Sequence, residues 1–218
     1  MQFSVACRTR RNALSRNMNG LQEHIHKHSS SDTAPAIGYR KETDLHWFVM
    51  RDLKRSNAKL PAYQMLGRMG IKVFTPMVWK MVVRHGKHIP QEVPFMQDLL
   101  FVHESYKVLY PIVERTSTLQ FRFLRDGKRT PMTVRDADMD RFIKAVEATE
   151  NPCFYSPQDI KPSMVGKYVR IIGGLLNGYE GRLQKLQGSR IKRLFVELPN
   201  LLTAAVEVQP EFIQIMKN

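Results

Sequence analysis

The sequence predicts an α+β fold in two parts: an antiparallel sheet flanked by helices, followed by a small β-barrel. Over residues 45–148, strand patterns and helix patterns of apolar residues follow one another along the chain. Residues 149–162 contain three prolines and no periodic pattern, as a linker does. From residue 163 to residue 218, short strand patterns are separated by turn-rich segments. We therefore expect one domain over 45–148, a proline-containing linker over 149–162 and a second domain over 163–218.

The composition indicates a globular protein with a strong excess of positive charge. Of its 218 residues, 43% are hydrophobic and 25% are charged, and no apolar run approaches the length of a membrane span. The net charge of +14 favours a polyanion, most often nucleic acid, as partner. Nine Lys and Arg residues against Asp52 and Glu92 give residues 45–97 a net charge of +7, half of the total. The charge is therefore not confined to a tail.

Residues 1–44 show no sustained period and carry a net charge of +3. Their polar composition is that of a basic, mostly disordered extension. His24, His26 and His28 alternate in a pattern that is able to clip a metal ion, but no cysteine or carboxylate cluster accompanies them. A solvated polar tract is the preferred interpretation, and we predict no metal site.

The apolar patterns of the first domain predict the element order β-α-β-β-α-β-α. Asp52 or Ser56 is placed to cap the first helix, and Pro61, which is tolerated only in a first turn, sets its start close to Lys59. Gly70 is placed to end that helix. The predicted elements are strands at 45–51, 71–83 (with a proline bend), 99–103 and 119–123, and helices at 59–70, 106–112 and 134–148. This order is typical of an antiparallel sheet covered by helices.

A glycine-rich stretch organises the second domain. Apolar and polar residues alternate from Tyr168 to Ile172, and the alternation resumes at Arg182 after a turn dense in glycine. Glycine in this turn suits backbone with positive φ, and Gly181 suits a strand that passes close to another backbone. Further strand patterns follow in residues 191–215. Five short strands in about fifty residues predict an SH3-like β-barrel.

This stretch resembles the KOW motif, the signature of NusG-type transcription factors and of some ribosomal proteins. The positions that carry the resemblance are Gly166, Val169, Ile171, Gly173, Gly174, Gly178 and Gly181. An ordinary glycine-turned hairpin shares only part of this pattern. The resemblance implies that the second domain recruits another protein, such as termination factor Rho or a small-subunit ribosomal protein. Leu175, Leu176 and Phe195 are candidate contacts if they are exposed.

The first domain resembles the NusG N-terminal domain. The matches are Trp47-Phe48-Val49-Met50, Val73-Phe74-Thr75-Pro76-Met77 with its basic hairpin, and Val93-Pro94 ahead of Leu99-Leu100-Phe101-Val102. The family usually has Phe-Pro-Gly-Tyr before its central strand, whereas here the segment is Phe95-Met96-Gln97-Asp98-Leu99. This variant looks like the UpxY-type antiterminators of capsular polysaccharide operons in Bacteroidetes, which are specialised NusG paralogues.

The resemblance implies a transcription elongation and antitermination factor that binds the clamp region of RNA polymerase through an apolar patch. By position, the patch would draw on Phe48, Phe74, Leu99, Phe101 and Phe123. Core packing is the alternative for each of these residues, because alternation turns about half of a strand's side chains inward.

The family also lies beside the non-template DNA strand, so the resemblance implies contact with that strand or with nascent RNA. Such contact would fall to the basic first helix and hairpin, namely Lys54, Arg55, Lys59, Arg84, His85 and Lys87. Cations neutralise phosphates, and an exposed aromatic ring stacks on an unpaired base. A solvated basic face is the alternative.

The sequence contains none of the common catalytic motifs, and we expect no enzyme activity and no cofactor. Asp136, Asp138 and Asp140 are interpreted as the start of a helix rather than as a carboxylate site. Two distant cysteines, Cys7 and Cys153, make no disulfide framework, so we expect a cytoplasmic protein, and we expect it to be a monomer. The alternative function is a ribosome-associated or other RNA-binding KOW protein, which the first domain does not fit.

Overall fold

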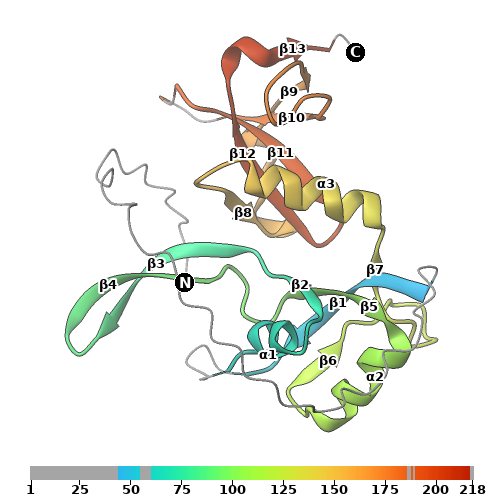
Figure 1. Ribbon diagram of the computed structural model, residues 1–218. Helices are drawn as coiled ribbons and strands as arrows, with labels where there is room; N and C mark the ends of the chain where they lie inside the picture. Colours follow the sequence, from blue (N-terminus) through green and yellow to red (C-terminus); the bar gives the residue numbers. More distant parts are fainter. Residues whose placement is uncertain (1–43, 55–59, 186–187, 189, 217–218) are drawn as a thin grey trace, which may run out of the picture. The chain divides into compact units, whose positions relative to one another are not determined.

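The computed structural model describes residues 44–54, 60–185, 188 and 190–216 (Figure 1). The predicted N-terminal extension, including His24, His26 and His28, lies outside the described residues apart from Asp44. Within the described ranges, no helix combines the length and the apolar character needed to cross a membrane.

The N-terminal sheet is built around one central strand. Its members, in order across the sheet, are β2 (Lys72–Phe74), β5 (Leu100–Ser105), β1 (Leu45–Asp52) and β6 (Leu119–Phe121), with β7 (Thr133–Val134) also paired to β1. All of these pairings are antiparallel, as predicted, and Val49 lies opposite Phe101. The run Trp47–Met50 is apolar throughout because the central strand is buried on both faces.

Three helices accompany this sheet: α1 (Ala62–Arg68), α2 (Tyr106–Arg115) and α3 (Asp136–Glu147). Helices α1 and α2 share a buried cluster with Phe48 and Met50, on one face of β1. Helix α3 shares a second cluster with Trp47 and Val49, on the other face. The predicted arrangement of an antiparallel sheet with flanking helices is therefore confirmed.

The first residue of helix α1 donates its backbone N–H to a buried carboxylate. The Oδ2 atom of Asp52 accepts a hydrogen bond from the Ala62 N–H at 2.6 Å, and Asp52 is only 7% exposed. Asp52 is one of the two residues expected to cap this helix. Pro61 occupies the position before the helix, so α1 starts at Ala62, three residues after the predicted start at Lys59. Gly70 follows the helix with a φ of 76°.

A separate two-stranded sheet extends from the N-terminal sheet (Figure 1). It consists of β3 (Met77–Arg84) and β4 (Lys87–Pro94), which pair along their whole length. The sequence predicted a single bent strand over residues 71–83, but the structure divides it into β2 and β3 at Thr75 and Pro76. Proline has no N–H to donate to a ladder, so β3 leaves the sheet to which β2 belongs.

A second, six-stranded antiparallel sheet contains the C-terminal part of the chain. Its order is β13 (Ile213–Ile215), β9 (Val165–Ile171), β10 (Glu180–Gln184), β11 (Lys192–Leu198), β12 (Leu202–Val208) and β8 (Cys153–Tyr155). The five predicted strands are present. The predicted SH3-like barrel is not shown, because the pairings between described residues include none that joins the outer strands β13 and β8.

Strand β8 lies within the segment 149–162 that the sequence indicated as a linker. It pairs with β12 through Phe154 and Ala204, and its three residues Cys153–Tyr155 are buried. The prolines of this segment suggested an irregular connection, but they flank an apolar triplet that is long enough to add one strand to the sheet. Short 3₁₀ turns at Pro157–Asp159 and Pro162–Met164 then lead into β9.

Helix α3 also contacts the C-terminal sheet. Arg141 donates a hydrogen bond from its guanidinium to the Glu180 carbonyl at 2.6 Å, and the Arg141 carbonyl accepts one from the Tyr179 hydroxyl at 3.0 Å. The Phe142 and Phe154 rings lie 6.5 Å apart. The α3 cluster therefore includes residues of both sheets.

Two glycines of the predicted hairpin have the properties that the sequence predicted: one has a positive φ, and the other lies close to a neighbouring backbone. Gly173 has a φ of 117°, in the left-handed region that other residues avoid. A Cβ atom at Gly181 would lie 2.7 Å from the Phe195 carbonyl oxygen and 3.3 Å from Leu194 Cδ1. Strands β10 and β11 thus approach too closely at Gly181 to admit a side chain.

We expect the substitution Gly181→Ala to lower the free energy of unfolding by about 1–3 kcal/mol, because the new methyl group overpacks a backbone contact. Gly67→Ala, in α1, is the control. A Cβ atom there meets nothing within 4 Å, so the protein should become more stable by about 0.5–1 kcal/mol. Urea unfolding followed by circular dichroism measures both changes. Equal responses would contradict the close approach at Gly181.

Candidate nucleic-acid and protein interfaces

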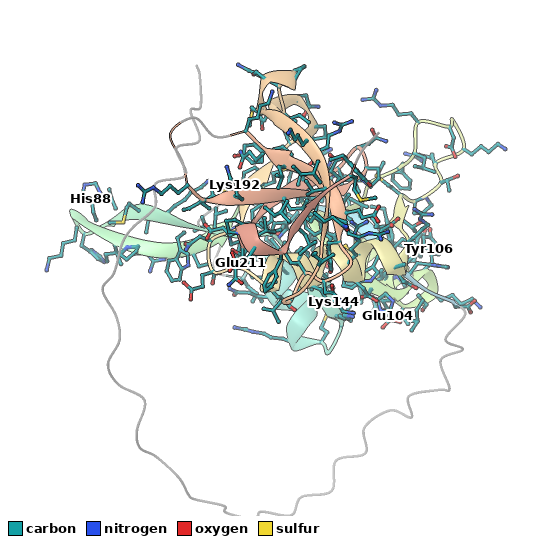
Figure 2. All side chains as sticks on the ribbon, turned by 90° about the horizontal axis from the view of Figure 1, so that it is seen from above. His88, Glu104, Tyr106, Lys144, Lys192 and Glu211 are labelled. Carbon is teal, nitrogen blue, oxygen red and sulfur yellow. The ribbon has the colours of Figure 1, made fainter. Side chains whose placement is uncertain are left out.

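The β3–β4 hairpin brings three of the predicted nucleic-acid residues together at its tip. Arg84 and Lys87 are directly paired, and His85 and Gly86 form the two-residue turn between them, with φ values of 51° and 73°. Positive φ at both turn positions is typical of a type I′ hairpin turn. Arg84, His85, Gly86 and Lys87 are all exposed, and in Figure 2 the neighbouring His88 lies at the outer end of the hairpin.

One face of the hairpin carries its cations, beside the apolar residues Val78, Val82, Ile89 and Val93. Side chains alternate along a strand, and directly paired residues point to the same side. Lys80 and Arg84 of β3 therefore share a face with Lys87 of β4, and all three are exposed. We call these three residues the basic face. Lys80 and Arg84 are four residues apart on β3, and Lys87 lies directly opposite Arg84, an arrangement that suits a polyanionic backbone.

The opposite face of the hairpin is apolar and exposed. Met77, Trp79, Met81 and Val83 follow one another at every second position, and we call them the apolar strip. The exposed fractions of Trp79, Met81 and Val83 are 66%, 49% and 62%. Sequence reasoning predicted a strand with a proline bend over this run and did not distinguish its two faces. The available signal was that both cations of β3, Lys80 and Arg84, fall at even-numbered positions.

The other predicted nucleic-acid residues belong to the segment before α1. Lys54 is described, and its Nζ donates a hydrogen bond to the Leu60 carbonyl at 2.8 Å, which ties the two ends of this segment together. Arg55 and Lys59 lie outside the described residues. The structure therefore describes four of the six predicted residues, three at the hairpin tip and Lys54 before α1.

The five residues predicted to contact polymerase do not form one patch in this structure. Phe48 is 4% exposed and belongs to the cluster under α1 and α2. Leu99 and Phe101 are 1% and 0% exposed and belong to the cluster with α3, on the opposite face. Core packing, the alternative that alternation suggested, is thus the state of these three side chains.

The remaining two predicted polymerase residues are more accessible. Phe74 is half-buried, and its ring lies 6.2 Å from Phe101 and 6.1 Å from Phe142. Phe123 is 44% exposed, with its ring 6.5 Å from Phe121. Phe74 and Phe123 therefore present surface without any rearrangement of the core.

The motif glycines and apolar residues form the β9–β10 hairpin. Val169 and Ile171 are buried, and Gly178 and Gly174, like Gly173, have positive φ. A Cβ atom at Gly166 would lie 2.8 Å from the Leu183 carbonyl oxygen, so this glycine also marks a close approach of backbones.

Away from its tip, the β9–β10 hairpin is stabilised by an ion pair. The Nε atom of Arg170 donates a hydrogen bond to Glu180 at 2.7 Å, and this bond together with the cation's charge lowers the pKa of that carboxyl group. At the tip, Leu175 is 84% exposed, whereas Leu176 and Phe195 are buried. Of the three candidate contacts for a recruited protein, only Leu175 meets the condition of exposure.

The carboxylates near α3 take the positions expected for a helix start. Asp136 and Asp138 lie in its first turn, and Asp138 accepts a hydrogen bond from Arg135 Nε at 2.7 Å. Across the part of the chain that the structure describes, no three His, Cys, Asp or Glu side chains are grouped so as to hold a metal ion.

We expect the double substitution Arg84→Ala and Lys87→Ala to weaken binding of single-stranded oligonucleotides. Losing two phosphate contacts should also flatten the slope of log K against log salt concentration by about 1.4. Fluorescence anisotropy titrations between 50 and 200 mM salt, about the range in which such slopes are measured, test this. The control is Lys128→Ala with Arg129→Ala, which removes the same charge from an exposed loop. An equal flattening in both variants would contradict a role for the hairpin tip.

Comparison with known proteins finds a family match for residues 45–143. No curated protein matches the chain. One similar solved structure, described as "Domain interaction in Thermotoga maritima NusG", is 15% identical, with 80% of this chain and 99% of that chain covered and a TM-score of 0.39. Residues 45–143 match the family described as transcription termination factor NusG. The matched residues contain the N-terminal antiparallel sheet, helices α1 and α2, the β3–β4 hairpin and the first part of α3.

Proposed function

We propose that this protein is a transcription elongation and antitermination factor that binds RNA polymerase. The observation that carries the proposal is the NusG-family domain over residues 45–143. The hairpin of this domain supports it, because three exposed cations share one rigid face and suit a nucleic-acid backbone. The protein acts by binding and positioning, in the cytoplasm and without catalysis of its own.

The C-terminal sheet is proposed to be a KOW domain that recruits a second protein. The positive φ values of Gly173, Gly174 and Gly178 and the close approach at Gly181 support this assignment. The exposed Leu175 at the hairpin tip is the residue best placed for such a contact, with Rho or a small-subunit ribosomal protein as the candidate partner.

The specialised role is proposed from the departure at residues 95–99. A general family member has a tyrosine at the position of Leu99, and here that residue is buried in the cluster with α3. A factor with this variant resembles the paralogues that serve polysaccharide operons. The non-template DNA strand or nascent RNA would then lie along the basic face of Lys80, Arg84 and Lys87.

We expect the full chain to retain purified core RNA polymerase of the source organism in a pull-down, and to raise read-through at terminators in transcription assays in vitro. A variant with Leu175→Ser is the matched control. Its exposed side chain lies outside the NusG-family domain, so it should retain polymerase to the same extent.

Failure to retain polymerase, combined with retention of ribosomal RNA, would contradict the proposal. The RNA-binding alternative would then take its place, because positive charge and a KOW motif fit a ribosome-associated protein equally well. Phe101→Ala is a poor probe for this experiment. Phe101 is fully buried, and its truncation should cost about 3–5 kcal/mol of stability whatever the protein binds.

A further inference from the structure

The apolar strip of the β3–β4 hairpin faces solvent. Trp79, Met81 and Val83 are 66%, 49% and 62% exposed, and none of them belongs to a hydrophobic cluster formed by the described residues. On the other side of the hairpin, Val78 packs against the cluster that contains α3. The rest of the described fold therefore supports only one side of the hairpin and leaves the strip uncovered.

The residues beside the strip carry almost no charge. Directly paired residues point to the same side, so β4 adds four residues to the side of the strip. They are His88, Pro90, Glu92 and Pro94. The basic face points the other way, and no lysine or arginine of β3 or β4 lies on the side of the strip. A nucleic-acid backbone therefore finds no cation to neutralise its phosphates on this surface.

An added strand at the edge of β4 is a poor way to cover the strip. Pro90 and Pro94 have no backbone N–H, so two positions of β4 cannot donate a hydrogen bond to another strand. An occupant of the strip has to lie against its face instead. Two sheets that pack face to face do so at a separation of about 10 Å.

The side of the strip is complementary to a second copy of itself when the two hairpins run in opposite directions. Met81 and Pro90 are directly paired, and a two-fold axis that crosses the hairpin at this pair relates the two copies. Trp79 of each copy then lies over Val83 of the other, because both are two residues from Met81. A large side chain thus meets a smaller one, as in a well-packed interface.

The same axis also matches the polar groups of β4. Glu92 and His88 are each two residues from Pro90, so Glu92 of one copy lies over His88 of the other. An imidazole N–H donates to a carboxylate whether or not the ring is charged. The parallel arrangement lacks this match. An axis along the strands would place Trp79 over Glu92 of the other copy and bury the carboxylate against an indole without a donor.

We propose that two copies of this protein associate through their apolar strips, with the hairpins packed face to face and antiparallel. The sequence led us to expect a monomer, and the exposed, self-complementary strip is the reason to propose association. An interface of one short ribbon from each copy lies at the low end of the specific size range, so the dissociation constant should be about 10–100 μM. The inference goes beyond the proposed function and does not depend on polymerase binding.

The dimer leaves the basic face of each hairpin on its outer side. Lys80, Arg84 and Lys87 of both copies therefore stay accessible, and the dimer presents two surfaces for nucleic acid. Each copy carries a net charge of +14, so repulsion between copies weakens association at low salt. Added salt screens this repulsion and does not weaken apolar contacts. Association should therefore become stronger as salt rises, which is opposite to the salt dependence of nucleic-acid binding.

The test is sedimentation velocity of the full chain, free of nucleic acid, between about 1 and 300 μM protein. We expect the sedimentation coefficient to rise from that of a monomer to that of a dimer. The dissociation constant should fall about threefold or more between about 50 and 500 mM salt. A dimer bridged by residual nucleic acid would respond in the opposite direction.

Neighbouring valines on the two sides of β3 supply a matched comparison. Val83→Ala should weaken the dimer about fivefold or more, and Trp79→Ala about a hundredfold, because each residue occurs twice in a symmetric interface. Val82→Ala makes the same truncation on the side of the cations, and its dissociation constant should stay within about twofold of wild type. Circular dichroism verifies that the three variants are folded.

A charge exchange tests the antiparallel register. Glu92→Arg and His88→Glu should each weaken the dimer about fivefold, because one removes the acceptor and the other places two carboxylates together. The double variant should return to within about twofold of wild type, because arginine and glutamate then face each other twice across the axis. Glu211→Arg, at an exposed residue outside the hairpin (Figure 2), changes the net charge as Glu92→Arg does and should weaken the dimer less than twofold, or about that.

The outcomes are distinct. A wild-type chain that remains monomeric over the whole concentration range would overturn the inference and leave the proposed function untouched. So would a dimer that Trp79→Ala and Val83→Ala do not weaken, or one that the double charge exchange does not restore. Loss of oligonucleotide binding in Trp79→Ala, without any wild-type dimer, would assign the strip to nucleic acid instead. Failure of polymerase binding bears only on the proposed function.

Discussion

The two-sided burial of strand β1 is the constraint on which the N-terminal domain depends. Trp47 and Val49 face the α3 cluster, and Phe48 and Met50 face the cluster of α1 and α2. A strand buried on both faces leaves no side for solvent, so partner binding has to use other surfaces or the outer edges of the sheet. The apolar residues nearest the centre of the sheet, including Phe101, are therefore buried in the core.

The β3–β4 hairpin escapes this constraint because Pro76 ends the pairing with the main sheet. A two-stranded ribbon without a covering layer exposes both faces, and an isolated ribbon of this kind has little stability of its own. The exposed apolar side chains of Trp79 and Val83 therefore contribute little to the stability of the fold.

In the C-terminal sheet, the backbones of neighbouring strands approach closely at two glycines, and no side chain separates them there. Gly166 and Gly181 let strands pass within distances that a Cβ atom would forbid. Helix α3 then connects the two sheets through Arg141, which hydrogen-bonds at both its guanidinium and its carbonyl to the β9–β10 hairpin. The packing of α3 is therefore shared between the N-terminal sheet and the C-terminal sheet.

The sequence by itself determined the features that depend on neighbouring residues. The apolar run of β1, the aspartates that begin α3, the Asp52 carboxylate before α1 and the motif glycines were all predicted, because caps, turns and alternation are local effects. The tertiary structure decided which apolar residues remain exposed. Phe101 and Trp79 look alike in sequence, yet one is fully buried and the other is 66% exposed. The difference arises because one strand lies between two helical layers and the other lies in a ribbon that no described element covers.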